Sequence, residues 1–209
     1  GRPCEAVDGI GFKQDFEDES TGSGVLPDCW DAIQYISSST YPYVYNSSYY
    51  KITGSNYLYF YGGTTSSEQI AILPPFTNTA DLYVTFNYNY YSVNASYGAL
   101  QVGYITNPKN AATFTSLQTL AMTSDVTKAE VAMTSAPAGS YVAIRFGGGS
   151  SSGTVSVDDI DITAIPSCTK PTDAVGVATA YNQASISWTS DASEWKLQYS
   201  ADNGENWTD

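Results

Sequence analysis

The chain has 209 residues, with 21 acidic residues, 8 basic residues and no histidine, which gives a formal net charge of −13. That charge argues against binding nucleic acid or anionic lipid, because both require Lys and Arg patches that neutralise phosphate. The absence of histidine excludes the usual forms of serine-protease, zinc-hydrolase and cysteine–histidine chemistry. A composition low in charge but with 18 tyrosines favours β-structure, and a binding or structural module over an enzyme.

Segments of apolar and β-branched residues alternate with turn signals along most of the chain, and amphipathic helical patterns are nearly lacking. Many strands without intervening helices predict an all-β fold, an antiparallel jelly-roll β-sandwich. Residues 125–133 are predicted to form a short helical turn. No run approaches the roughly 20 apolar residues of a membrane span, so no membrane insertion is expected. The clearest strand candidates are 57–61, 69–73, 82–91, 99–105, 141–146 and 154–163.

The composition changes where Pro166 and Pro171 flank a short polar stretch, which is typical of an interdomain linker. We therefore expect a first domain over residues 1–166 and a second over 167–209. The second part, with three short predicted strands, resembles the opening of a fibronectin type III or immunoglobulin-like β-sandwich, with Trp188 as its core tryptophan. Such a sandwich needs about 90–100 residues, so this module is expected to be partial and the native chain to continue.

The last predicted strand of the first domain carries Asp158, Asp159 and Asp161. Strict alternation puts Asp158 on the same face as Ile160, and Asp159 on the same face as Val157. A desolvated carboxylate must be protonated, paired or bound to a cation, and few basic residues are available. Ligation by oxygen alone favours Ca²⁺. A solvated acidic edge is an equally weighted alternative.

Tyrosines are dense in residues 41–61 and 88–91. A tyrosine ring with its hydroxyl suits stacking on sugars or packing on protein partners. It is equally suited to half-exposed strand faces, and for any single tyrosine the structural role is favoured. The candidates for ligand binding are Tyr43, Tyr45, Tyr49 and Tyr90.

Several motifs, taken in chain order, resemble those of the cleaved-adhesin and MAM-type jelly-roll domains of bacterial surface proteins. They are an early FE (Phe16-Glu17), P-x-x-W at 27–30, a TNP…FT loop at 106–115, AG-x-YVA-x-RF at 138–146 and a closing DDI at 158–160. The resemblance spans residues 15–162 and implies a jelly roll, often followed by fibronectin-like modules. It also implies a structural Ca²⁺ that ties the first strand to the last through Glu17 and Asp158 or Asp159.

The resemblance bears on the three cysteines as well. A pair like Cys4–Cys29 would bridge around the first strand, whereas the second MAM-type pair is missing. Cys168 lies in the predicted linker and is an alternative partner for Cys4. A disulfide would place the protein outside the cytosol, and no signal peptide is visible, which is compatible with a trimmed one.

The function expected on these grounds is that of a non-catalytic, extracellular adhesin or carbohydrate-binding accessory module of a bacterial surface protein. Its partners would be a glycan or a host or matrix protein, together with neighbouring domains of a longer chain. Two alternatives stay open: a fragment of a glycan-active hydrolase, and a structural spacer without a ligand. The fold does not fix the ligand.

Overall fold

The computed structural model describes residues 4–167, 171–181, 183–190, 194–200, 202 and 204–208. The chain divides into two compact units, Gly1–Ile165 and Pro166–Asp209, and the division falls beside the predicted linker. Each unit is described by itself. Among the described residues no helix is long and apolar enough to cross a membrane.

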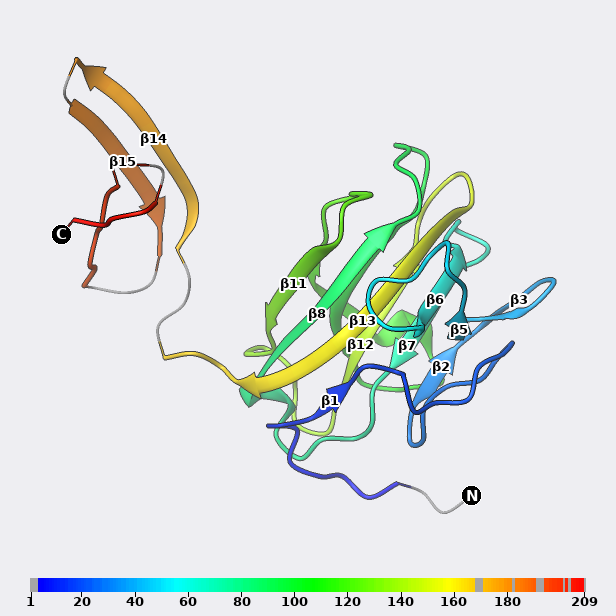
Figure 1. The fold of residues 1–209 in the computed structure, drawn as a ribbon. Coiled ribbons are helices and arrows are strands. Elements are labelled where there is room, and N and C mark those ends of the chain that lie inside the picture. The colour runs from blue at the N-terminus through cyan, green and yellow to red at the C-terminus, as the bar shows by residue number, and fades with distance from the viewer. Residues whose placement is uncertain are drawn as a thin grey trace. The chain divides into compact units, whose positions relative to one another are not determined.

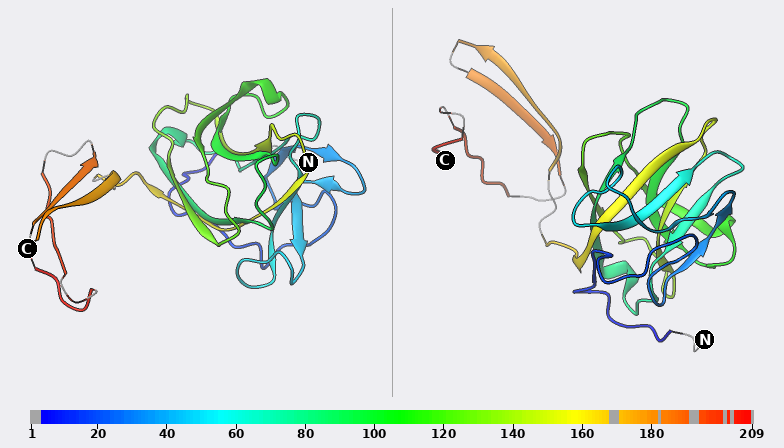
Figure 2. Two further views of the ribbon diagram at one scale, coloured as in Figure 1. Left: turned by 90° about the horizontal axis from the view of Figure 1, so that it is seen from above. Right: turned by 45° about the vertical axis from the view of Figure 1, so that its right-hand side comes forward.

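The first unit is a sandwich of two antiparallel β-sheets, whose layers can be followed in Figures 1 and 2. Sheet 1 has the strand order β11–β8–β13–β6–β5, and β1 pairs with the free part of β13. Sheet 2 has the order β10–β9–β12–β7–β2, and β3 and β4 form a separate hairpin. The strands are β1 (Lys13–Gln14), β2 (Asp31–Ile33), β3 (Tyr35–Ile36), β4 (Thr40–Tyr41), β5 (Tyr43–Asn46), β6 (Asn56–Gly62), β7 (Gln69–Ile72), β8 (Leu82–Tyr90), β9 (Ala99–Ile105), β10 (Phe114–Thr119), β11 (Thr127–Ala132), β12 (Tyr141–Gly147) and β13 (Gly153–Ala164).

The core lies between the two sheets and follows from the period-2 pattern of the strands. In sheet 1 every second residue of β8, from Leu82 to Tyr90, is buried, and in sheet 2 the same holds for Val142, Ile144 and Phe146 of β12. Each large apolar side chain buried in this way contributes about 1.5–3 kcal/mol. The all-β sandwich expected from the sequence is therefore confirmed.

One predicted element is wrong. Residues 125–133 do not form a helical turn, because Thr127–Ala132 form strand β11 at the edge of sheet 1, paired with β8. The segment is rich in Ala, Lys and Glu, which favour helices, but pairing with β8 overrides this weak preference. Ala129 and Val131 are buried against the core, while Lys128 and Glu130 point outward.

Strand β13 contains a β-bulge that corrects the expected alternation. The register with β8 shifts between Asp158 and Asp161, and Asp159 adopts a left-handed backbone with φ 52°. One extra residue in the strand reverses the side-chain alternation after it. The apolar residues on both sides of the bulge consequently face the core, and Asp158 does not share the face of the isoleucines. Those buried residues are Val155, Val157, Ile160 and Ile162.

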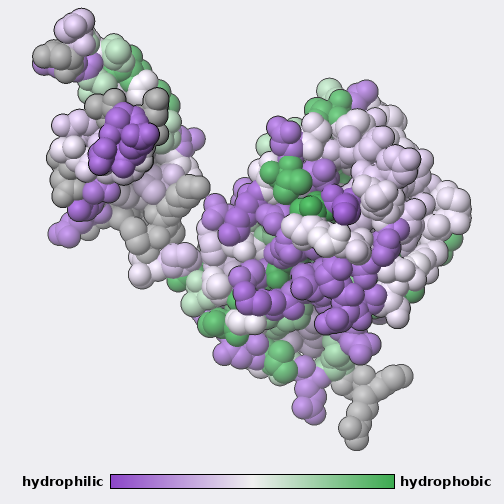
Figure 3. Space-filling view, in the orientation of Figure 1, coloured by the Kyte–Doolittle hydropathy of each residue, from purple (hydrophilic) through white to green (hydrophobic). Residues whose placement is uncertain are grey.

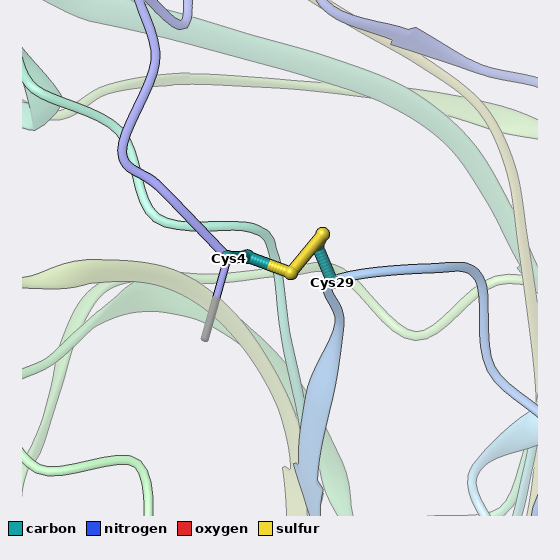
Figure 4. Close-up of a disulfide and its surroundings, with 2 residues drawn as sticks. All are labelled: Cys4 and Cys29. Atoms are coloured by element: carbon teal, nitrogen blue, oxygen red, sulfur yellow. A yellow bond between two sulfur atoms is a disulfide. The ribbon is translucent and has the colours of Figure 1, made fainter. Parts of the chain in front are cut away.

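A disulfide joins Cys4 to Cys29, with their Cα atoms 5.7 Å apart (Figure 4). This is the pairing that the family resemblance implied. The disulfide fixes the N-terminal segment next to the start of β2. An isolated backbone β-bridge between Val7 and Phe76 holds the same segment. The alternative partner, Cys168, lies outside the described residues.

Among its described residues, the second unit forms a hairpin of β14 (Thr172–Ala180) and β15 (Gln183–Thr189). The third strand predicted over 194–200 is represented among the described residues by a single bridge between Tyr199 and Thr208. Trp188 is half-buried and packs edge-on against Trp195, with ring centroids 5.6 Å apart.

Candidate functional site

The outer face of sheet 1 carries a ladder of tyrosines on β5 and β6. Alternation along these strands sends Val44, Leu58 and Phe60 into the core, where each is fully buried. The intervening side chains therefore point away from the core. Register places Tyr43 opposite Tyr59 and Tyr45 opposite Tyr57.

The rings of the ladder contact one another and form a second, all-tyrosine cluster outside the main core. Ring centroids lie 5.0 Å apart for Tyr45 and Tyr59 and 5.6 Å apart for Tyr43 and Tyr59. Such edge-on and tilted pairs contribute about 0.5–1.5 kcal/mol each beyond the burial of their area. The buried members are Tyr41, Tyr43, Tyr57 and Tyr59, and the partly buried members are Tyr35, Tyr45 and Tyr50.

Exposed rings lie on top of this cluster. Tyr50, from the loop between β5 and β6, packs 4.9 Å from Tyr91 and 5.4 Å from the buried Tyr59. Tyr49 is 79% exposed, Tyr91 56% and Tyr61 36%. We call the five half-exposed or exposed side chains of this surface, Tyr45, Tyr49, Tyr50, Tyr61 and Tyr91, the tyrosine face.

Polar side chains adjoin the tyrosine face along the same rows of sheet 1. Ser156 of β13 lies between Tyr59 on β6 and Asn89 on β8, and Thr154 lies opposite Tyr61. Ser156 is itself buried, so the accessible polar groups beside the aromatic rings are the half-buried amide of Asn89 and hydroxyl of Thr154. In Figure 3, which views the molecule as Figure 1 does, hydrophilic surface is extensive over this unit and hydrophobic surface is confined to small patches.

Burial raises the pKa of the cluster tyrosines above the ordinary value of 10.0. The effect is large for Tyr57 and Tyr59, because desolvation disfavours the phenolate, and it extends to Tyr43 and Tyr50. These rings stay neutral near physiological pH. Their hydroxyls are donors, as when Tyr57 donates to the carbonyl oxygen of Ser47 at 3.4 Å.

The predicted ligand-binding tyrosines have separate outcomes. Tyr45 and Tyr49 belong to the tyrosine face, whereas Tyr43 is only 7% exposed. Tyr90 is a core residue, fully buried, whose hydroxyl donates to the Gly98 carbonyl and accepts from the Leu100 amide. The prediction that Tyr43 and Tyr90 bind a ligand is therefore wrong, because both side chains are buried.

Sequence reasoning missed three members of the tyrosine face. Tyr61 follows the same alternation as Tyr57 and Tyr59, so the period of β6 contained the signal. The positions of Tyr50 and Tyr91 depend on how loops fold over the sheet, and no local pattern encodes that.

Next to this surface, Glu17 accepts hydrogen bonds from backbone amides. Its Oε1 accepts from the amides of Ser55 at 2.8 Å and of Asn56 at 3.0 Å. The chain positions this side chain through a left-handed residue, Phe16, with φ 60° and a fully buried ring. Glu17 therefore links the segment after β1 to the start of β6.

Asp158 and Asp159 contact the same loop from the bulge of β13. Asp158 Oδ2 accepts from the Thr53 amide at 3.2 Å and from its hydroxyl at 3.0 Å, while Oδ1 accepts from the Asp159 amide at 2.8 Å. Asp159 Oδ2 accepts from the Thr53 hydroxyl and from Asn87 Nδ2, each at 3.0 Å. We call Glu17, Asp158 and Asp159 the carboxylate anchor.

The Asp158 carboxyl group is fully buried. Burial, in part offset by hydrogen bonds from Thr53 and Asp159, raises its pKa from 3.8 to about 6. The ion pairs among the described residues join other acidic groups to Lys13, Lys109 and Arg145, and leave the carboxylate anchor without a basic partner.

The carboxylate anchor does not meet at one point. Among the described residues, no three acidic or cysteine side chains lie close enough together to hold a metal ion. The structure brings Glu17, Asp158 and Asp159 together differently, since all three bind the segment 53–56 as hydrogen-bond acceptors.

Known proteins resemble this chain in the fold of its sandwich but not in sequence. No family model and no curated protein matches the chain. The K1 cleaved adhesin domain of Lys-gingipain from Porphyromonas gingivalis W83 superposes with a TM-score of 0.54 and 17% identity, covering 76% of this chain and 100% of that one. The K2 cleaved adhesin domain of Lys-gingipain gives a TM-score of 0.52 and 18% identity, covering 74% of this chain and 98% of that one.

A carbohydrate-binding module solved in complex with β-1,4-galactotriose is less similar, with a TM-score of 0.45 and 9% identity, covering 66% of this chain and 90% of that one. At these identities the likeness concerns the fold. The first unit is an all-β two-sheet sandwich like those of cleaved adhesin domains.

Proposed function

We propose that this chain is a non-catalytic, extracellular adhesin or carbohydrate-binding module of a bacterial surface protein, and that its ligand lies on the tyrosine face. The observation that carries the proposal is the exposure of several tyrosines in one place, supported from below by buried rings. A planar aromatic ring offers its face to the C–H groups of a sugar, and the neighbouring amide and hydroxyl groups can bind sugar hydroxyls. Because the exposed rings are already packed, little side-chain freedom is lost on binding.

The charge of the molecule selects among glycans. The net charge is −13, and Asp158, Asp159 and Asp161 lie on or beside the outer face of the same sheet. Like charges repel a polyanion at long range. The proposed ligand is therefore a neutral glycan, free or attached to a host or matrix protein, and not a uronate or a sialylated chain.

Affinity electrophoresis tests this function. Native gels containing neutral galactan, xylan or β-glucan should retard the wild-type chain in at least one case, and polygalacturonate should not. Tyr49→Ala and Tyr91→Ala should each weaken the affinity measured from retardation at least about tenfold, since burying a large apolar side chain is worth about 1.5–3 kcal/mol. Tyr181→Ala is the matched control, because Tyr181 is fully exposed in the second unit. Equal retardation of all variants would refute the assignment of the tyrosine face.

The two rival functions give different results. Turnover of chromogenic glycosides by the chain would show a hydrolase, which two carboxylates can support. Failure to bind any glycan or common host protein would favour a structural spacer. The extracellular location is supported by the Cys4–Cys29 disulfide, because such bonds persist in oxidising compartments.

We also propose a structural Ca²⁺ at the carboxylate anchor. Carboxylate oxygens are the ligand type that a hard cation prefers, and the fully buried Asp158 has no basic partner among the described residues. Ca²⁺ takes about 6–8 oxygen ligands. Because Glu17, Asp158 and Asp159 do not converge on one point, the other ligands of the ion would be backbone carbonyls and water. The ion would neutralise the anchor and stabilise the native state by linkage.

Removal of the ion tests this site. EDTA should lower the melting temperature, and Ca²⁺ should restore it better than Mg²⁺, which gives up its waters reluctantly. Glu17→Gln should abolish most of the Ca²⁺ effect. Glu5→Gln, at an exposed position, is the control. Identical melting curves with EDTA and with Ca²⁺ would refute the site.

For the second unit we propose the beginning of a fibronectin type III-like sandwich. The β14–β15 hairpin supports this, because both of its faces carry apolar side chains, with Val175 and Val177 exposed on one face and Ile186 46% exposed on the other. A hairpin is marginally stable alone and requires further strands to bury such side chains. Fluorescence of a hydrophobic dye bound to the whole chain should fall in a Val175→Ser/Val177→Ser variant.

A further inference from the structure

The loop between β5 and β6, residues 47–55, carries two members of the tyrosine face, Tyr49 and Tyr50. Figure 1 shows this loop in front of β6 and β13, over the outer side of sheet 1. The ring of Tyr50 contacts Tyr59 beneath it and Tyr91 beside it. The position of the loop therefore decides whether the exposed rings form one surface.

The first end of the loop is fixed by neutral hydrogen bonds. The Tyr57 hydroxyl donates to the carbonyl oxygen of Ser47 at 3.4 Å, and Asn46 Nδ2 donates to Asn56 Oδ1 at 3.0 Å. Both contacts lie within the β5–β6 pair itself. They close the loop but do not tie it to the rest of the sheet.

The second end is fixed by the carboxylate anchor. Thr53 donates its amide and its hydroxyl to Asp158 and Asp159, while Ser55 and Asn56 donate their amides to Glu17. These acceptors come from distant parts of the chain, with sequence separations of 38 for the Ser55 bond and 105 for the Thr53 bond. Hydrogen bonds to charged acceptors are roughly twice as strong as neutral ones.

Gly54 shows how closely the loop approaches the anchor. Its φ is +47°, and a Cβ at this position would overlap the Glu17 side chain. The loop therefore lies directly on the carboxylate and is not joined to it through a spacer.

We propose that the carboxylate anchor positions the tyrosine face: by binding the end of the loop it holds Tyr49 and Tyr50 in the arrangement that receives a glycan. This proposal rests on the proposed function for its purpose, but not for its geometry. Without the anchor the loop would sample many positions, and ordering it on binding would reduce affinity. Glu17, Asp158 and Asp159 are positioning residues, since none of them belongs to the tyrosine face.

A pair of matched threonine variants tests the proposal. Thr53→Val removes the hydroxyl that donates to Asp158 and Asp159. Thr85→Val removes a hydroxyl of the same sheet that donates to the Asp161 carbonyl instead. Hydrogen exchange followed by mass spectrometry, in EDTA, should show amides of residues 47–56 exchanging on the order of tenfold faster in Thr53→Val. The same amides should be unchanged in Thr85→Val.

Glu17 supplies a second comparison with a rescue. Glu17→Ala should accelerate exchange in residues 47–56. Glu17→Gln should restore slow exchange, because a glutamine amide retains the Oε1 acceptor while losing the charge that a cation requires. Retardation in neutral galactan, xylan or β-glucan gels should fall in Thr53→Val and Glu17→Ala, and remain in Thr85→Val and Glu17→Gln.

The outcomes separate this proposal from the proposed function. Unchanged exchange of residues 47–56 in both Thr53→Val and Glu17→Ala would overturn the positioning role, whatever the gels show. Faster exchange without glycan retardation of any variant, wild type included, would confirm that the anchor holds the loop and would refute glycan binding.

Discussion

Raising the pH in the presence of EDTA should destabilise this protein through Asp158. Its carboxyl group is fully buried, and desolvation raises its pKa to about 6 in the folded state, from 3.8 for an unperturbed group. Between these two values the folded state retains a proton that the unfolded state has lost. The contribution of Asp158 to stability is therefore complete below about pH 4 and is lost as the pH rises through about 6.

The size of the effect follows from the two pKa values. A pKa of about 6 in place of 3.8 corresponds to about 3 kcal/mol, since each pKa unit equals about 1.4 kcal/mol. For a domain of this size 1 kcal/mol changes the melting temperature by about 2–4 °C. The expected loss from Asp158 alone is thus on the order of 6–12 °C.

Thermal unfolding followed by near-UV circular dichroism at about pH 4.5 and 7.5 captures about two thirds of this effect, because at pH 4.5 most of the unfolded chain has already lost the proton. Other carboxylates also titrate, so the relevant quantity is the difference in pH dependence between wild type and Asp158→Asn. The side-chain amide of this variant has no acidic proton to lose, and the variant should lack the decline. Ca²⁺ at the proposed site should suppress the decline in wild type, because it stabilises the ionised form. Equal pH dependence of wild type and variant in EDTA would refute the burial argument.

Three further predictions concern the first unit. Replacing Cys4 and Cys29 by Ser should cost about 3.5 kcal/mol of unfolding free energy for a bridge of separation 25, measured by urea unfolding; peptide mapping of the unreduced protein should find the pair oxidised. Tyr90→Phe should cost about 1–3 kcal/mol, because it leaves buried backbone groups without a partner, and should not change glycan retardation. Gly103→Ala should destabilise by several kcal/mol, since its Cβ would overlap the Thr115 carbonyl of the neighbouring strand; a melting temperature within about 2 °C of wild type would contradict this.

The sequence was sufficient to predict the β-sandwich, because the patterns that indicate strands and turns are local. Alternation in β8 and β12 shows which side chains face inward, and turn residues separate the strands. The same rule failed at β13, where one inserted residue at Asp159 changes which face each later side chain occupies. Val157 and Ile160 both being apolar was the available signal, since a regular strand would have placed them on opposite faces.

The candidate site was only partly predictable, because two of its components depend on tertiary structure. Glu17 and Asp158 were singled out and do bind the same loop, but their hydrogen-bond donors belong to a segment without any motif. The exposure of Tyr49 and the burial of Tyr90 differ because one lies in a loop and the other in the middle of a sandwich. Composition marks both as tyrosines in dense tracts and cannot distinguish them.

The buried tyrosine cluster sets a limit on the tolerance of the protein to alkali. Tyr57 and Tyr59 of the cluster, and Tyr90 of the main core, all have raised pKa values, that of Tyr90 reaching about 12, because burial disfavours their phenolates while the rings stay packed. Stability that is intact below about pH 10 declines above it, as each ring gains more from ionising in the unfolded chain. The absorbance of tyrosinate near 295 nm from these buried rings should therefore rise together with the opening of the sandwich. This makes the cluster an optical reporter of unfolding that needs no label.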